Sequence, residues 1–194
     1  LLIGILEGFA EATAGLSKGY FGKLSDSYQR RLPFVQFGYT LSAFSKLMLG
    51  LYAATGWVFA ARTVDRLGKG IRTSARDALL SSETTPEHKG KVFGFHRSAD
   101  TIGAALGPIL AIIYLYYYPA QYSTLFIIAF VPGVLGAFVT LLIKEKNVPT
   151  THTVKSSTSF FSFLLYWKDS PSDFRALAFG LIFFAIINSS DVFI

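Results

Sequence analysis

The chain has 194 residues, of which 52% are hydrophobic and 15% are charged, and its mean hydropathy is +0.44. Soluble domains commonly carry about a quarter charged residues, so this composition indicates lipid rather than water as the main solvent. The chain has no cysteine, which excludes disulfides and cysteine-ligated metals, and its three histidines lack zinc-site spacing. The net charge of +6 is spread between apolar runs, which argues against a nucleic-acid partner.

Six apolar stretches are long enough, at roughly 20 residues each, to cross a bilayer as helices. Their connections are short, so successive stretches must alternate in direction. Both ends of the chain fall in apolar runs, and we expect the chain to be a fragment of a longer protein. The sequence therefore predicts an all-α membrane protein with about six transmembrane segments, near residues 1–22, 33–55, 56–76, 93–116, 123–143 and from 174 onward.

Lysine and arginine gather in every second connection. The connections after the first, third and fifth segments are basic, whereas residues 51–56 and 111–130 contain neither residue type. Under the positive-inside rule, the basic connections lie in the cytoplasm. Trp57 and the tyrosines between Tyr114 and Tyr122 fall at the opposite boundary, where amphipathic rings prefer to lie. We therefore predict a multi-pass protein of the cell (inner or plasma) membrane.

Several ionic side chains lie inside these segments, where each costs about 2.5–3.5 kcal/mol at the bilayer centre. Helical spacing puts the acids of the first segment on one face of that helix, and it also puts the ions of the third segment on one face of theirs. We hypothesise an internal ionic cluster that faces a central cavity, in which protonation changes which partners pair. The alternative is a set of buried ion pairs that only hold the helices in register. The cluster comprises three acids and three bases, Glu7, Glu11, Lys46, Arg62, Asp65 and Arg66.

Residues 22–26 (GKLSD), followed by Arg30 and Arg31, resemble the signature loop between the second and third helices of major facilitator transporters. This resemblance implies a cytoplasmic gate formed by Asp26, Arg30 and Arg31. An aspartate at a helix end beside paired arginines suits such a gate physically, because it caps backbone N–H groups and forms an ion pair. The alternative is helix capping together with a topology signal.

Two further patterns resemble motifs of the same family. Arg62, Asp65, Gly68 and Gly70 are similar to the fourth-helix motif, with Arg66 in place of a glycine, and this implies that Arg62 takes part in proton coupling. A second set keeps the spacing of the fifth-helix motif that is typical of the antiporters, which favours efflux. Because His96, Asp100, Gly103 and Gly107 share one helix face, we expect close packing and a bend before Pro108, either as a hinge or as a simple packing kink. This set is Gly94, Gly103, Gly107 and Pro108.

The resemblance implies that the chain runs from about the second to the seventh helix of a major facilitator-type bundle. Residues 1–143 would form the N-terminal transmembrane bundle without its first helix. Residues 144–173 would form a cytoplasmic linker with an interfacial patch at 160–167, and residues 174–194 would start the second bundle. Asp100 and Asp191 are candidate cavity residues, although residues 188–191 also suit a hydrogen-bonded patch between helices.

The predicted function is secondary active transport of a small solute, as proton-coupled efflux (antiport) by alternating access. The expected partners are the solute, protons and the lipid bilayer, without nucleic acid, cofactor, metal or an obligate protein partner. A uniporter or an importer of the same fold, a channel and a scaffold are alternatives. An intramembrane enzyme is a further alternative, but it requires a nucleophile–base pair or a metal triad, and His96 has no clear partner of that kind. We therefore predict that the chain is not an enzyme.

Overall fold

The computed structural model describes residues 2–28, 30–52, 54–145 and 170–188. Every regular element in these ranges is a helix, which confirms the predicted all-α fold. The six α-helices fall on the six predicted segments, although α1, α3 and α4 extend beyond the predicted ends on their basic sides. The elements are α1 (Leu2–Tyr28), α2 (Leu32–Leu51), α3 (Thr55–Ser82), the 3₁₀ helix η1 (Pro86–His88), α4 (Lys89–Tyr117), α5 (Tyr122–Leu142) and α7 (Ser172–Asn188).

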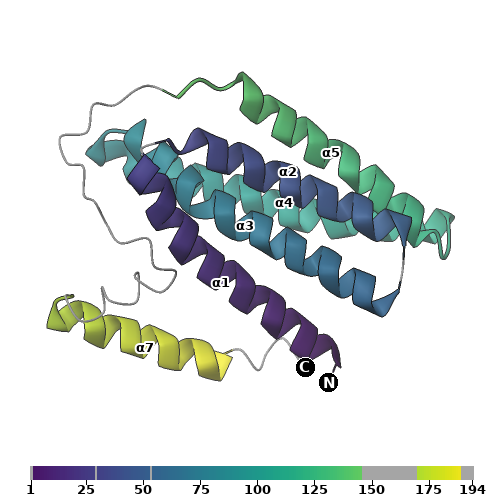
Figure 1. The fold of residues 1–194 in the computed structure, drawn as a ribbon, viewed down its shortest axis with the longest axis horizontal. Coiled ribbons are helices and arrows are strands. Elements are labelled where there is room, and N and C mark those ends of the chain that lie inside the picture. The colour runs from purple at the N-terminus through teal and green to yellow at the C-terminus, as the bar shows by residue number, and fades with distance from the viewer. Residues whose placement is uncertain (1, 29, 53, 146–169, 189–194) are drawn as a thin grey trace. The chain divides into compact units, whose positions relative to one another are not determined.

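The helices from α1 to α5 follow one another through short connections and run in alternating directions (Figure 1). This alternation brings the α1–α2 turn, the α3–α4 turn and the segment after α5 to the same end of the bundle, which we call the basic end. The α2–α3 and α4–α5 turns lie at the other end, the aromatic end. There the indole N–H of Trp57 donates a hydrogen bond to the carbonyl oxygen of Met48 at 2.6 Å.

Helix α3 packs against both α1 and α2, and α2 also packs against α5. Glycines on α3 allow these close approaches. A Cβ atom on Gly70 would lie 2.6 Å from Ser17 Cβ and 2.7 Å from the Ala14 carbonyl oxygen of α1. A Cβ atom on Gly68 would lie 2.8 Å from the Gly38 carbonyl oxygen of α2. Small residues at helix crossings are typical of membrane bundles, where backbones approach closely.

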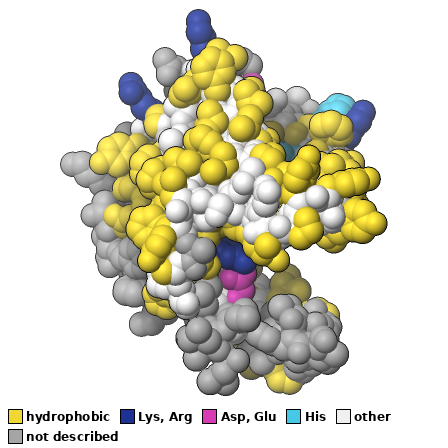
Figure 2. All heavy atoms as spheres, turned by 90° about the vertical axis from the view of Figure 1, so that its right-hand side faces the viewer, with side chains coloured by type: hydrophobic (Ala, Val, Ile, Leu, Met, Phe, Trp, Pro, Cys, Tyr) yellow, Lys and Arg dark blue, Asp and Glu magenta, His cyan; other side chains and the backbone are white. Residues whose placement is uncertain are grey.

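Most buried positions of this bundle hold small residues, although Leu32, Met48 and Ile71 are buried too, and many large apolar side chains point outward. The buried positions include Ala10, Ala14, Ala43, Ala61 and Ala75. Phenylalanine, leucine and isoleucine side chains instead cover much of the outer surface, as Figure 2 shows for one face. This inverted distribution suits a helical bundle whose surroundings are lipid, because lipid tails are as apolar as leucine.

Two described helical stretches, Pro86–Tyr117 and Tyr122–Leu142, are long and apolar enough to cross a membrane by length and composition alone. Both contain an internal proline, Pro108 in α4 and Pro132 in α5. Helices α1, α2 and α3 carry the six ionic side chains of the predicted cluster.

The chain separates into two units, residues 1–155 and residues 156–194. The first unit contains the helices from α1 to α5. In the second unit, the described part contains α7, a helix of 17 residues with Asp173 in its first turn. The predicted interfacial patch at residues 160–167 lies outside the described residues, and the predicted bundle and linker boundaries stay predictions.

Candidate functional site

Two arginines of α3 and two glutamates of α1 form a continuous ionic group where these helices face each other. Arg66 Nη2 lies 3.0 Å from Glu7 Oε1, and Arg66 Nη1 lies 2.9 Å from Glu11 Oε1. Arg62 Nη1 lies 3.4 Å from the same oxygen of Glu7. One turn of helix separates the members of each pair, so each helix presents its two charges on one side. Glu7 therefore contacts both arginines, and Arg66 bridges both glutamates.

A second pair lies on the side of α3 that faces α2. Lys46 Nζ is 3.9 Å from Asp65 Oδ1, and the buried hydroxyl of Ser45 donates a hydrogen bond to the same oxygen at 3.2 Å. Lys46 also donates a hydrogen bond to the Ser42 carbonyl oxygen at 3.2 Å. Asp65 and Arg66 are consecutive, so α3 carries one acid toward α2 and one base toward α1. The six predicted cluster residues thus form two adjacent groups, and no ion pair within the described part of the chain joins them.

Solvent exposure differs among the members of the α1–α3 group. The Arg66 side chain is 18% exposed, whereas those of Arg62 and Glu11 are 47% and 53% exposed. The Nε atom of Arg66 is buried and has no hydrogen-bond partner among the described residues. Arg66 is therefore the fixed centre of the group, and Glu11 is its most accessible carboxylate. The sequence placed Arg66 in the cluster, and the structure shows that it makes the shortest contacts.

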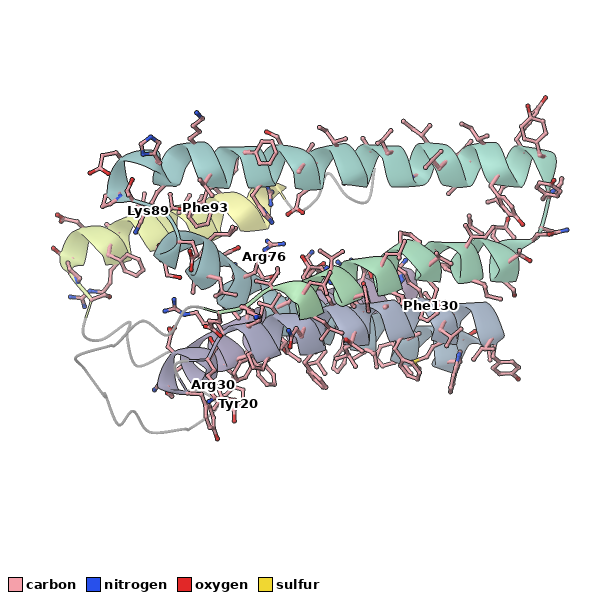
Figure 3. All side chains as sticks on the ribbon, turned by 90° about the horizontal axis from the view of Figure 1, so that it is seen from above. Tyr20, Arg30, Arg76, Lys89, Phe93 and Phe130 are labelled. Atoms are coloured by element: carbon pink, nitrogen blue, oxygen red, sulfur yellow. The ribbon has the colours of Figure 1, made fainter. Side chains whose placement is uncertain are left out.

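The predicted gate residues lie at the basic end, and the structure brings two of them together. Arg31 Nη2 is 3.3 Å from Asp26 Oδ1, and Arg31 Nη1 donates a hydrogen bond to the Ala78 carbonyl oxygen of α3 at 3.2 Å. Arg31 therefore joins the ends of α1 and α3 at the start of α2. Arg30, labelled in Figure 3, is exposed and forms no ion pair within the described ranges.

Glu145, which follows α5, makes contacts that the sequence did not predict. Its carboxylate accepts hydrogen bonds from the Arg31 backbone N–H at 2.9 and 3.1 Å, and from the Leu32 backbone N–H at 3.0 Å. These residues are more than 110 positions apart. An acid between Lys144 and Lys146 gives no local signal for such a role, so only the tertiary structure reveals it.

Asp100 of α4 lies beside two basic groups at the basic end. Arg76 Nη1 is 3.7 Å from Asp100 Oδ2, and His96 Nδ1 lies 3.7 Å from the same oxygen. Arg76 also contacts Asp77 at 3.3 Å. Figure 3 shows Arg76 on the side of α3 that faces α4. The sequence predicted Asp100 as a candidate cavity residue, and the structure adds its pairing with Arg76 and His96.

The glycines that resemble the family's fifth-helix motif lie on α4, and they have no close neighbours among the described residues. A Cβ atom on Gly94, Gly103 or Gly107 would meet no described atom within 4 Å. Pro108 lies inside the helix, as expected. Close packing at these positions therefore stays a prediction. Asp191 lies outside the described residues.

A family model described as the Major Facilitator Superfamily matches residues 1–194, the whole chain. Over all of its length the chain is 32% identical to an uncharacterized MFS-type transporter of Methanocaldococcus jannaschii, of which it covers 46%. Over 77% of its length it is 31% identical to an uncharacterized protein of Mycobacterium tuberculosis, of which it covers 36%. No solved structure matches the chain.

A more distant relative is a probable 4-methylmuconolactone transporter of Cupriavidus pinatubonensis, 27% identical over 74% of the chain. The match covers 33% of that protein. The chain therefore spans half or less of the length of these relatives.

Proposed function

The chain belongs to the major facilitator superfamily, and from this premise we propose that the whole protein is a secondary transporter that moves a small solute across a membrane by alternating access. The observation that carries this proposal is the bridge from Arg66 to Glu7 and Glu11. Charges inside transmembrane helices are expensive and commonly mark solute or ion pathways. An intramembrane ionic group that is balanced yet partly accessible suits a transport site better than a purely structural one.

We propose that the glutamates couple transport to protons. Protonation of Glu11 removes its charge and leaves Arg66 paired with Glu7 alone, so one edge of the guanidinium becomes free. Glu11 is the more exposed of the two carboxylates and is therefore the expected site of proton exchange with the cavity. Arg62 then provides the second contact that holds Glu7 in place. Proton binding and solute binding become linked because both change the same set of ion pairs.

Efflux by antiport is the direction that the sequence favours. The spacing of Gly94, Gly103, Gly107 and Pro108 is similar to the fifth-helix motif of antiporters in this family. The relative described as a probable 4-methylmuconolactone transporter supports a small organic molecule as the solute class. The bundle has a basic end and an aromatic end, and the positive-inside rule supports a cytoplasmic location for the basic end. We place the protein in the plasma membrane on this basis.

Flux measurements in proteoliposomes test the proposal. The full-length protein is reconstituted with an imposed pH gradient and an internal pH dye, and then offered a pool of drugs and metabolites. We expect solute-linked proton movement that is lost in Glu11→Gln and Arg62→Ala, and retained in Glu87→Gln, an exposed carboxylate on η1. Full activity in both cluster variants would remove the cluster from the mechanism. Solute flux without proton movement would indicate a uniporter instead.

A further inference from the structure

The start of α2 depends on an acceptor that its own sequence does not provide. The residue before the helix is Arg31, whose side chain cannot accept hydrogen bonds, and no local side chain caps the first turn. Pro33 has no backbone N–H. The Arg31 and Leu32 N–H groups are among the donors at this start, and the first N–H groups of any helix need partners from outside it. Glu145 accepts hydrogen bonds from both, using both carboxylate oxygens.

The residue that Glu145 holds is also the residue that closes the predicted gate. The Arg31 guanidinium contacts Asp26 at the end of α1 and the Ala78 carbonyl oxygen of α3. Its backbone N–H is fixed by Glu145 at 2.9 Å. Charge-assisted hydrogen bonds from a helix start to a carboxylate are stronger than neutral ones, and the helix dipole adds to the attraction. The position of the Arg31 backbone therefore depends on the segment that follows α5.

We propose that Glu145 is a positioning residue for the gate. It holds the α1–α2 turn so that Arg31 reaches Asp26 and Ala78, and it thereby links opening of the basic end to the position of Glu145 after α5. When Glu145 withdraws, the Arg31 and Leu32 N–H groups lose their acceptor and the Asp26–Arg31 pair loosens. This inference rests on the proposed alternating-access function, but it concerns a residue outside the ionic cluster of α1 and α3.

Glu145→Gln in the full-length protein tests the first half of this proposal. A neutral amide offers one carbonyl oxygen in place of two charged oxygens, so hydrogen exchange at the Arg31 and Leu32 amides should accelerate about fivefold, the factor for one lost hydrogen bond. Lys144→Gln changes the charge of the neighbouring residue and serves as the control, with unchanged exchange expected. Glu145→Asp keeps the carboxylate and should give an intermediate rate, which also provides a second variant if Glu145→Gln folds poorly. Unchanged exchange in both Glu145 variants would overturn the proposal.

A cysteine at Ser25 tests the second half, because it reports on the gate without any transported solute. Ser25 is 1% exposed and precedes Asp26, so Ser25→Cys should react with a maleimide only when the turn opens. We expect faster labelling when Glu145→Gln is added. We also expect Asp26→Asn and Glu145→Gln to be non-additive, since both act through Arg31. Accelerated amide exchange with unchanged labelling would make Glu145 a simple helix cap and sink the inference, while the proton-linked flux test would still decide the proposed function.

Discussion

Arg66 Nη1 lies 2.9 Å from Glu11 Oε1, and its second terminal nitrogen lies 3.0 Å from Glu7. A planar guanidinium spans two carboxylates in this way, whereas a lysine ammonium is a single point charge. We therefore expect Arg66→Lys to keep the formal charge but to lose proton-linked flux. The loss of stability should be about 1–3 kcal/mol, between the values for exposed and buried pairs. Arg97→Lys is the matched control, because Arg97 is an exposed arginine of α4 that lies outside the ionic groups. Thermal unfolding and flux of both variants check the prediction, which fails if the two behave alike.

The close crossing of α1 and α3 at Gly70 leaves no room for a methyl group. A Cβ atom there would lie 2.7 Å from the Ala14 carbonyl oxygen, and backbone atoms cannot turn aside as a side chain can. Gly70→Ala should therefore force the helices apart and cost about 1–3 kcal/mol, the range for overpacked cores. Gly15→Ala on α1 is the control, since a Cβ atom there meets nothing within 4 Å. Comparison of their unfolding temperatures in detergent tests the difference, and equal temperatures would contradict the crossing.

Asp100 provides the polar link between α4 and α3. Asp100→Asn should weaken its contact with Arg76 while leaving the Arg76–Asp77 pair intact. We expect faster hydrogen exchange in the first three turns of α4, because that helix makes few other contacts with α3. Asp77→Asn removes the other carboxylate that contacts the Arg76 guanidinium. Because Asp77 lies in α3 itself, this variant should leave hydrogen exchange in α4 unchanged. Equal exchange profiles for the two variants would show that the link does not hold α4.

The turn between α4 and α5 contains one residue with left-handed backbone geometry. Ala120 has a φ angle of 65°, a conformation that costs a residue with a Cβ atom roughly 1–2 kcal/mol and costs glycine much less. We therefore expect Ala120→Gly to stabilise the protein, by about 1 kcal/mol after the greater flexibility of glycine in the unfolded chain is included. Ala54→Gly is the control, because Ala54 has a φ angle of −74° and gains nothing from glycine. The unfolding temperature should rise for Ala120→Gly, and it should fall or stay level for Ala54→Gly.

The sequence predicted the helices well because apolar length and turn spacing determine where each one lies. The α2 segment, predicted at residues 33–55, is a helix at Leu32–Leu51. The α3 segment, predicted to end at Arg76, continues to Ser82, since its polar last turns escape a hydropathy criterion but still form helical hydrogen bonds. The 100° spacing also placed Glu7 and Glu11 on one face of α1 correctly.

The sequence could not predict which residues of different helices contact one another, because these contacts depend on how the helices cross. On α1, a Cβ atom on Gly8 or Gly15 would meet nothing within 4 Å, whereas one on Gly22 would lie 3.0 Å from Ser74 Cβ. Glycine spacing alone does not tell which of these positions lies at a crossing. Glu145 was missed for the same reason, since its partners lie more than 110 residues away in the chain.

The two ends of the bundle should lie on opposite sides of the membrane. Lys89 and Lys91 begin α4 at the basic end, and the positive-inside rule predicts that this end faces the cytoplasm. The described part of the chain contains no cysteine, so single cysteines can be introduced there without background from it. An impermeant maleimide should label Ser123→Cys at the start of α5 in intact cells, and should label Ser27→Cys at the end of α1 only after lysis. Both side chains are exposed, so accessibility alone does not separate them. Labelling of both positions from the same side would contradict the alternating directions of the helices across the bilayer, and the transport proposal would fail with it.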